Sequence, residues 1–269
     1  MNSDGGTYDI ITTMSHEALV ESPKLEVFSL NTALTGRQFG EGLFEKILDF
    51  ICKGPDVVLL QEVYEGSLER FTNALGGRFV FSRMCNLSLT DRVEEAEGWG
   101  VAIGSRYRFV DTREDYYHGI RENSYETVLN NGLQSTSSLL QARVERGSER
   151  FNFGTTHFTW HNRAEPSDEQ LKDFEKLAVI LDRTPDLVLT GDFNSPRGHP
   201  IFDSLAKRYR DNIPAEIKTT LDTGVRPEAT WELVVDGFFT SEHYRVPNLR
   251  MVQGFSDHYG VLGEVQRVL

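Results

Sequence analysis

The order of apolar and polar residues along this chain predicts short strands interspersed with a few helices. Continuous apolar runs, which are typical of buried strands, occur at residues 25–31, 56–62 and 186–194. Apolar residues recur at helical spacing between Arg37 and Lys53 and again after Ser167-Asp168, where Ser167 is suited to cap the helix. We therefore expect buried strands that are covered by helices.

Further strands are predicted in pairs. Residues 98–105 and 108–112 surround a turn, residues 139–146 and 150–158 flank Gly147-Ser148 as in a β-hairpin, and residues 231–241 and 258–268 are the last two strands. Since strands outnumber helices and several neighbours are linked by hairpins, the pattern favours an α+β fold with largely antiparallel sheets. Residues 84–98 and 113–137 are polar and show neither period, so we expect long functional or irregular loops there.

Composition narrows the class of protein. The chain has 269 residues, 39% hydrophobic and 26% charged, as in ordinary globular proteins, and no run of 18 apolar residues that would span a membrane. Residues 1–22 are polar and weakly patterned, and we expect an N-terminal tail whose order the sequence leaves open. This stretch lacks the basic and apolar regions of a secretory signal, so a cytoplasmic location is expected. Cys52 and Cys85 are too few for a disulfide framework and are expected to be plain thiols.

The chain is acidic, with 28 Lys and Arg against 41 Asp and Glu and a formal net charge of −13. Such a protein does not bind nucleic acid through its overall charge. Nucleic acid is still a permitted substrate, because a local cleft and a bound metal ion outweigh the global field. The basic run at 207–210 would fit a nucleic-acid backbone, although a solvated helix face is the more common use of such a run.

Residues suited to metal binding and acid–base chemistry gather at the predicted ends of strands, where a rigid scaffold aims side chains into one cleft. They are carboxylates, Asn-type amides and two histidines: Asn31, Glu62, His157, Asp192, Asn194, Asp236, Asp257 and His258. Oxygen ligands of this kind select Mg²⁺ or Mn²⁺. Because the chain has no Gly-rich phosphate loop, phosphate-ester hydrolysis is favoured over nucleotide-driven phosphoryl transfer.

Six short motifs resemble a known family. LNT at 30–32, LLQEV at 59–63, TTHF at 155–158, TGDFNSP at 190–196, VVDGFF at 234–239 and FSDHYGV at 255–261 appear in the order found in the endonuclease/exonuclease/phosphatase superfamily. GDFN alone is a weak signal, whereas six motifs in order over nearly the whole chain are strong. The resemblance implies a four-layer α/β/β/α sandwich, with two mixed sheets packed face to face and helices outside, and a catalytic domain at 23–269.

The resemblance also implies which residues bind metal. Glu62 is expected to be the principal ligand of Mg²⁺, for which Mn²⁺ would substitute, with Asn31 and Asp257 on the metal side of the site. Ala33 stands where many nuclease members carry a second acidic or amide residue. Since an alanine side chain cannot bind a metal, a one-metal site or a different second ligand is expected.

The remaining strand-end residues are expected to act on the substrate. By the same resemblance, Asp192 orients or deprotonates the attacking water, and Asn194 binds the phosphate or that water. His258 is expected to contact the scissile phosphate and to be oriented by Asp236. His157 occupies the position where DNase-like members have a histidine.

Residues outside these motifs are less specific candidates. Arg197 and His199 would reach a phosphate, and His161 would reach the rim of the cleft. Trp160, Tyr116 and Tyr117 would stack on bases or cover a lipid headgroup. Trp99 and Trp231 are expected in the core, and Gly237 replaces the aromatic residue that often follows the orienting aspartate in the family.

The sequence thus predicts a Mg²⁺-dependent phosphodiesterase that hydrolyses a phosphate ester by direct attack of water, with DNA or RNA as the first substrate expected. A phosphoesterase acting on a lipid headgroup or a small soluble ester is the alternative. The inositol-phosphatase signature is absent, which argues against inositol phosphates. A relative that binds without catalysis is the third hypothesis. The protein is expected to be a monomer without an obligate protein partner.

Overall fold

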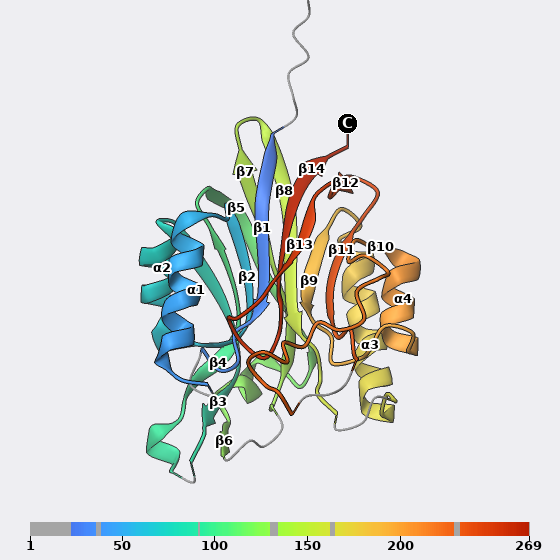
Figure 1. Cartoon of the computed structure of the whole chain (residues 1–269). Coiled ribbons are helices and arrows are strands. Elements are labelled where there is room, and N and C mark those ends of the chain that lie inside the picture. The colour runs from blue at the N-terminus through green and yellow to red at the C-terminus, as the bar shows by residue number, and fades with distance from the viewer. Residues whose placement is uncertain are drawn as a thin grey trace, which may run out of the picture.

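A computed structural model describes residues 23–35, 39–90, 92–129, 134–161, 165–228 and 232–268. In this part of the chain two mixed β-sheets pack face to face, and a pair of helices covers the outer side of each sheet (Figure 1). The predicted α+β class and the four-layer sandwich are therefore confirmed. The tail at 1–22 lies outside the described residues, and the prediction made for it stays a prediction.

The first sheet has the strand order β12-β14-β1-β2-β4-β3-β6, with β13 beside β14. Its strands are β1 (Lys24–Asn31), β2 (Val57–Tyr64), β3 (Arg78–Ser88), β4 (Glu97–Ser105), β6 (Thr127–Leu129), β12 (Tyr244–Arg245), β13 (Leu249–Val252) and β14 (Gly260–Arg267). β1 pairs with β2 in parallel and with β14 in antiparallel orientation. Helices α1 (Glu41–Lys53) and α2 (Leu68–Leu75) lie on the outer face of this sheet (Figure 1).

The second sheet has the order β10-β11-β9-β8-β7-β5. Its strands are β5 (Arg108–His118), β7 (Ser137–Arg146), β8 (Glu149–His157), β9 (Val188–Asp192), β10 (Arg210–Asp211) and β11 (Asp236–Thr240). β8 and β9 run in parallel, whereas β9 and β11 are antiparallel. Helices α3 (Asp168–Asp182) and α4 (Pro200–Arg208) cover its outer face (Figure 1).

The hydrophobic core forms three layers that match this arrangement. Side chains such as Leu59 and Phe153 meet between the two sheets. Leu60 packs with Ile47 beneath α1, and Leu189 packs with Leu177 beneath α3. Because the central strands are buried on both faces, their sequences are continuous apolar runs without alternation, and this pattern made them easy to predict.

The two long polar stretches, 84–98 and 113–137, contain more regular structure than the sequence predicts. The expectation of long irregular loops there is wrong. β3 continues to Ser88, and the connection to β4 contains a short 3-10 helix, η2 (Val93–Glu95). β5 continues to His118, followed by the 3-10 helix η3 (Arg121–Tyr125) and β6. The cause for β5 is its place at the edge of the second sheet, where partly exposed positions show no apolar alternation.

The ends of several predicted elements also shift. The first helix begins at Glu41, after Gly40, while residues 36–38 lie outside the described part. The strand predicted at 231–241 is confined to β11, and the hairpin around Gly147-Ser148 is confirmed. Ser167 caps α3 as expected, since its hydroxyl accepts a bond from the amide of Gln170 and the Gln170 side chain binds back to Ser167.

Trp99, Cys52 and Cys85 differ in their exposure to solvent. Trp99 is buried as predicted, whereas Trp231 lies outside the described residues. Cys52 is exposed, Cys85 is buried, and both thiols are free. None of the described helices is long and apolar enough to cross a membrane.

Candidate active site

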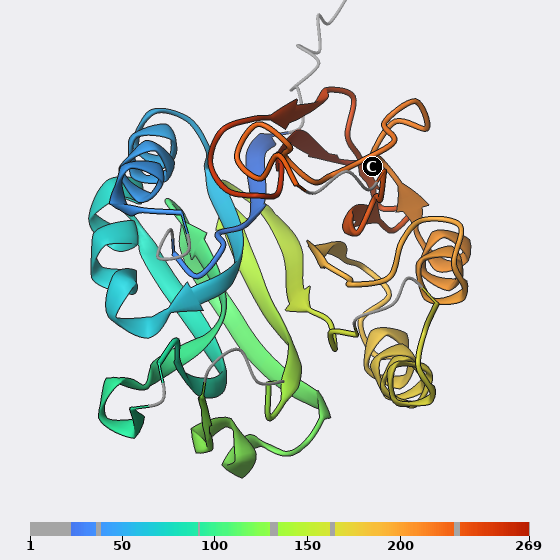
Figure 2. The same cartoon turned by 60° about the horizontal axis from the view of Figure 1, so that its bottom comes forward.

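Six strands bring the strand-end residues to one edge of the sandwich, which comes forward in Figure 2. β1, β2, β8 and β9 end at this edge, and the antiparallel strands β11 and β14 begin there. In the register of the second sheet, Asp192 lies opposite both His157 and Asp236. We use the term strand-end cluster for Asn31, Glu62, His157, Asp192, Asn194, Asp236, Asp257 and His258.

Two members of this cluster, Glu62 and Asn194, have backbone conformations that are unusual for residues other than glycine. Glu62 lies in β2 where the pairing with β4 shifts register, and it has a φ of 55°. Asn194 has a φ of 47°, and its amide donates to Asp192 Oδ1 over 2.8 Å, which forms an Asx turn after β9. Non-glycine residues adopt positive φ at a cost, and such residues concentrate where function requires a particular side-chain direction.

Asn31 connects the two sheets at the centre of the cluster. Its Nδ2 donates to Glu62 Oε1 and to Asp192 Oδ2, each over 3.0 Å, and its Oδ1 accepts a bond from the amide of Ala33. The side chain therefore holds two carboxylates together and positions them. Its Oδ1 keeps a second lone pair, so the expected place of Asn31 on the metal side of the site stays a prediction.

His157 faces the same two carboxylates. Its Nε2 lies 3.4 Å from Glu62 Oε1 and 3.7 Å from Asp192 Oδ2, and the side-chain amide of Asn194 lies 3.4 Å from the same nitrogen. The edge of the Trp99 ring packs against the imidazole, with ring centroids 5.3 Å apart. His157 is thus held in place by packing on one side and by charged groups on the other.

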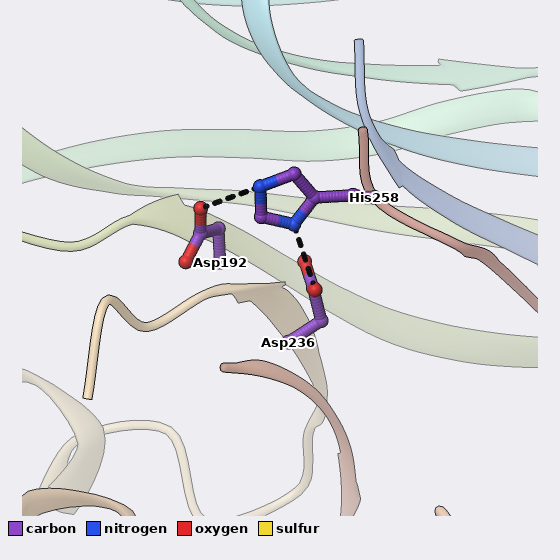
Figure 3. Close-up of side chains that lie close together, drawn as sticks. All are labelled: Asp192, Asp236 and His258. Carbon is purple, nitrogen blue, oxygen red and sulfur yellow. Dashed lines mark hydrogen bonds and ion pairs between the residues drawn. The ribbon is translucent and has the colours of Figure 1, made fainter. Parts of the chain in front are cut away.

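His258 lies between two carboxylates (Figure 3). Its Nδ1 is 2.8 Å from Asp236 Oδ2, and its Nε2 is 3.7 Å from Asp192 Oδ2. This is the pairing that the sequence predicts for Asp236 and His258. The three residues bring one ligand-type atom each within 4.8 Å of one another. The bond from Nδ1 to Asp236 leaves Nε2 of His258 near Asp192, an arrangement that is suited to acid–base chemistry.

The charges of the cluster shift its protonation equilibria. Burial lowers the pKa of His258, but the Asp236 carboxylate more than offsets this and holds the pKa well above its ordinary value. Burial also opposes the charged form of His157, and the nearby Glu62 and Asp192 raise its pKa in spite of that. Burial would raise the pKa of Glu62, yet bonds from His157 and Asn31 keep it below the ordinary value.

Glu62 and Asp257 fit a divalent cation. Burial raises the pKa of the Asp257 carboxyl, and the charge of Glu62 raises it further, against the opposing charges of His258 and Arg226. A divalent cation beside the two carboxylates would stabilise the charged form of Asp257. Their oxygen atoms match the ligands that Mg²⁺ and Mn²⁺ prefer. These two residues are therefore the ones suited to hold the metal that the family resemblance implies.

No motif in the sequence indicates residues 220–222, which contact both the segment of Asp236 and the segment of Asp257. The amides of Val235 and Asp236 donate to Thr220 Oγ1, and the amide of Asp222 donates to the Asp257 carbonyl over 2.8 Å. Residues 220–222 therefore lie between the chain segment that contains Asp236 and the segment that contains Asp257. This role depends on a bridge between Leu221 and His258, a long-range contact that no local pattern announces.

The candidates near α3 and α4 include side chains that make structural contacts and one exposed aromatic side chain. Arg197 donates to Asp211 Oδ2 over 2.7 Å and to the Ile213 carbonyl, so its described contacts fasten the chain after α4. His199 lies just before α4 with Nδ1 3.6 Å from Glu165 Oε2. In contrast, Trp160 is 48% exposed and follows β8, which places an aromatic ring three residues after His157. His161 is next to it, with a buried Nδ1.

The expectation that Tyr117 stacks on a base or headgroup is wrong. Tyr117 is buried, its ring stacks on Phe158, and its hydroxyl hydrogen-bonds with Thr156 Oγ1 over 2.7 Å. Tyr116 is partly buried, and its hydroxyl donates to the Arg83 carbonyl. Successive side chains of a strand point to opposite faces. Tyr117 of β5 therefore packs against Phe158 on one face, while Tyr116 points to Arg83 on the other.

The basic run at 207–210 belongs to the end of α4. Lys207 and Arg208 are in the last turn of this helix, where cations are favoured by the helix dipole, and Arg208 pairs with Asp182 of α3. Tyr209 is buried. Lys207 and Arg208 are therefore better described as part of a solvated helix face, as expected, than as a binding surface for nucleic acid.

A sandwich whose buried carboxylates and histidines meet across both sheets belongs to a class of phosphoesterases. More specifically, the chain belongs to the endonuclease/exonuclease/phosphatase family, whose model matches residues 30–258. A search of curated proteins finds no match.

Solved structures share this fold at low sequence identity. An endonuclease/exonuclease/phosphatase family protein from Bacteroides thetaiotaomicron superposes with a TM-score of 0.66 at 17% identity, covering 93% of this chain and 100% of that chain. TDP2 from D. rerio, complexed with a single-strand DNA product, gives 0.64 at 15%, with 90% and 99% covered. The human Nocturnin catalytic domain with bound sulfate gives 0.66 at 15%, with 92% and 96% covered.

Proposed function

We propose that this protein is a metal-dependent phosphodiesterase that hydrolyses its substrate by direct attack of water. The observation that carries this proposal is the Asp192 carboxylate, which lies 3.7 Å from both histidines and accepts a bond from Asn31 of the opposite sheet. A carboxylate held in this way is suited to orient a water molecule and accept its proton.

The histidines supply the complementary charge. Because Asp236 keeps His258 protonated, the imidazolium is suited to donate a hydrogen bond from Nε2 to a phosphoryl oxygen. His157 presents its Nε2 from the other side of Asp192, together with the amide of Asn194. In this proposal the two histidines stabilise the charge that develops on the phosphate while Asp192 acts on the water.

Glu62 and Asp257 are the proposed ligands of Mg²⁺ or Mn²⁺. When bound, such an ion polarises a phosphoryl oxygen and stabilises the leaving oxygen. Asn31 keeps Glu62 in position through its 3.0 Å bond, and Glu62 stays ionised because its pKa is depressed. In this proposal the metal ligand Glu62 and the acid–base residues share one cluster, in which His157 Nε2 lies 3.4 Å from Glu62 Oε1.

Nucleic acid is the first substrate class proposed. The fold of this chain resembles that of D. rerio TDP2, whose structure holds a single-strand DNA product. The exposed Trp160 close to His157 would offer a surface on which a base can stack. Arg197, whose contacts are structural, is not needed for this proposal.

A small or lipid phosphodiester is the second candidate, and the acidic net charge of −13 favours it. The segments that connect β3, β4 and β6 carry Glu94 and Glu95 in η2, Glu97 at the start of β4, Glu122 in η3 and Glu126 after it, while Arg92 and Arg121 there pair with Glu95 and Glu114. Carboxylates in such number repel the extended backbone of a polyanion. A substrate with a single phosphate would suffer less from this repulsion.

The test is a comparison of substrates with one pair of proteins. Wild-type protein and Asp192→Ala are incubated with Mg²⁺ or Mn²⁺ and with supercoiled plasmid, single-stranded DNA, RNA, choline phospholipid vesicles or bis(p-nitrophenyl) phosphate. Cleavage of any substrate that needs the metal and is lost in the variant supports the proposal, and the substrate with the fastest turnover decides between the two classes. No metal-dependent cleavage of any of them would contradict it.

A further inference from the structure

Arg226 contacts the proposed metal side of the cluster. Its Nη1 lies 3.3 Å from Asp257 Oδ2, with 38% of the arginine side chain and 12% of the aspartate side chain exposed. Among the residues that the structure describes, no other lysine or arginine side chain forms an ion pair with a member of the strand-end cluster. A guanidinium thus approaches a carboxylate that is also suited to bind a divalent cation.

The turn that carries Arg226 is fixed to the cluster by Asp222. The buried Asp222 carboxylate accepts bonds from the amides of Gly254 over 2.6 Å and Gly224 over 2.9 Å, and the Asp222 amide donates to the Asp257 carbonyl. The Arg226 amide in turn donates to the Asp222 carbonyl over 3.0 Å. The arginine is therefore presented by a turn that is itself bonded to the residue it contacts.

Electrostatics sets Arg226 and a divalent cation in competition. Both are attracted to Asp257, and two cations close to one carboxylate repel each other. An arginine that leaves Asp257 remains anchored beside the site through its turn and keeps its charge, because a guanidinium is not deprotonated in proteins. Its planar donors would then be available to a substrate phosphate next to the metal, in competition with Glu228, whose Oε1 lies 3.6 Å from Arg226 Nε.

We propose that Arg226 is the counter-ion of Asp257 that a divalent metal displaces, and that the displaced guanidinium then binds the substrate phosphate. The proposal rests on the metal-dependent function proposed above. Metal and oxyanion binding are consequently coupled, since each favours the arrangement in which Arg226 has left Asp257. Arg226 would be a binding residue of the phosphate that none of the six sequence motifs contains.

The first experiment measures metal binding by isothermal titration with Mn²⁺ for wild type, Arg226→Gln, Arg226→Lys and Arg250→Gln. Arg250 is the matched control, because its exposed side chain on β13 lies near Glu26 and outside the cluster. Removing the charge at Arg226 should strengthen Mn²⁺ binding by about tenfold. Arg226→Lys should remain close to wild type, and Arg250→Gln should not change the affinity.

The second experiment titrates sulfate, a tetrahedral oxyanion, into the Mn²⁺-saturated proteins. Arg226→Gln should bind sulfate at least about tenfold more weakly than wild type, while Arg250→Gln should match wild type. Thermal unfolding midpoints close to the wild-type value would show that the variants are folded.

Three outcomes separate this inference from the proposed function. Tighter Mn²⁺ binding together with weaker sulfate binding in Arg226→Gln supports the inference. Unchanged or weaker Mn²⁺ binding in a folded Arg226→Gln, or unchanged sulfate binding, overturns it while the function stands. Absence of saturable Mn²⁺ binding to wild type would overturn the proposed function and, with it, this inference.

Discussion

Asp192 receives contacts from both sheets, and the proposed chemistry depends on this one carboxylate more than on any other. Asn31 and the Asn194 amide bond to its two oxygens, and both histidines lie near its Oδ2. Each of these partners is delivered by a different strand end or loop. A small displacement of any of them would change the position of the water that Asp192 is proposed to orient.

Asp236 acts through His258, and removing its charge tests that role. Asp236→Asn keeps the shape of the side chain but no longer stabilises the imidazolium, so turnover should fall by at least about 10²-fold. Steady-state kinetics on bis(p-nitrophenyl) phosphate and the unfolding midpoint provide the measurement. The control is Asp182→Asn, an exposed carboxylate at the end of α3. Turnover near the wild-type rate in a folded Asp236→Asn would remove this pair from the mechanism.

Glu62 is proposed to bind metal, and its substitution should affect metal affinity first. Glu62→Gln is nearly isosteric and keeps an oxygen that can accept the Asn31 bond, but it lacks the negative charge. We expect Mn²⁺ affinity to fall by about tenfold or more, as seen when a ligand charge is lost. Isothermal titration measures it, with Glu65→Gln as the control in the adjacent 3-10 helix, η1 (Glu65–Ser67). Equal Mn²⁺ affinity in wild type and Glu62→Gln would exclude Glu62 as a ligand.

At the scale of elements, the close approach of β8 and β9 sets the spacing of His157 and Asp192. Gly191 has a φ of 146°, and a Cβ at this position would lie 2.1 Å from the Thr156 carbonyl oxygen. The neighbouring residues Thr156 and His157 pair with Gly191 and Asp192. Only a glycine therefore allows these two strands to bring their last residues together.

Gly191→Ala should push these strands apart. We expect a loss of about 3 kcal/mol or more in the free energy of unfolding, because backbone strain and a steric clash combine, together with a large loss of activity. Urea denaturation measures the stability. Gly42→Ala in α1 is the control, since a Cβ there meets nothing within 4 Å and alanine favours a helix. If Gly191→Ala were as stable as wild type, the strand spacing would not depend on this glycine.

The end of β5 and helix α3 are joined by an ion pair that makes stability depend on pH. His118 Nδ1 lies 2.8 Å from the buried Asp173 Oδ2, which also accepts a bond from Thr159 Oγ1. The bond to Asp173 raises the pKa of His118 in spite of burial. Glu169, 3.9 Å away, favours the protonated histidine, and Lys176 opposes it.

The sign of this effect is testable. A histidine whose pKa is raised on folding contributes stability that is complete below about pH 6.5 and is lost as the pH rises through the raised value. The difference in unfolding free energy between wild type and His118→Asn should therefore shrink between about pH 6 and pH 9. Urea denaturation at both pH values measures it, with His243→Asn as the control. A difference that grows toward high pH would contradict the assignment.

The sequence allowed the central elements to be predicted more reliably than the peripheral ones. β1, β2 and β9 are buried on both faces and appear as apolar runs, and α3 has an N-cap that satisfies the usual pattern. β5 lies at an edge, so its exposed positions conceal its strand character. The six motifs identified the whole strand-end cluster, but its bonds across the sheets could not be deduced because they depend on sheet packing.

Some site features had no local signal at all. The positive φ of Glu62 comes from a register shift against β4, which is a property of the pair of strands. The contact of Arg226 with Asp257 depends on the turn held by Asp222, which joins segments about 30 residues apart in the sequence. The hydrogen bond from the Ala33 amide to Asn31 Oδ1 likewise depends on the turn after β1, which no local pattern predicts.

At the scale of the whole molecule, the net charge of −13 limits how a nucleic acid could bind. Within the basic run at the end of α4, Arg208 pairs with Asp182 of α3, and in the described part of the chain Arg226 is the arginine that forms an ion pair with the cluster. Any cleavage of DNA should therefore fall by no more than about fourfold between about 50 and 200 mM salt, since one phosphate contact gives a slope near −0.9. A fall of about 10³-fold in initial rate would instead reveal a basic track for the backbone.

The account as a whole claims that both sheets of the sandwich build one metal-dependent hydrolytic site. The most direct measurement is the rate of p-nitrophenolate release from bis(p-nitrophenyl) phosphate by wild type and Asp192→Ala, each with Mn²⁺ and with EDTA. The account predicts release that requires Mn²⁺ and is at least about 10²-fold slower in the folded variant. Equal rates for the two proteins, or a wild-type rate that EDTA does not reduce, would contradict it.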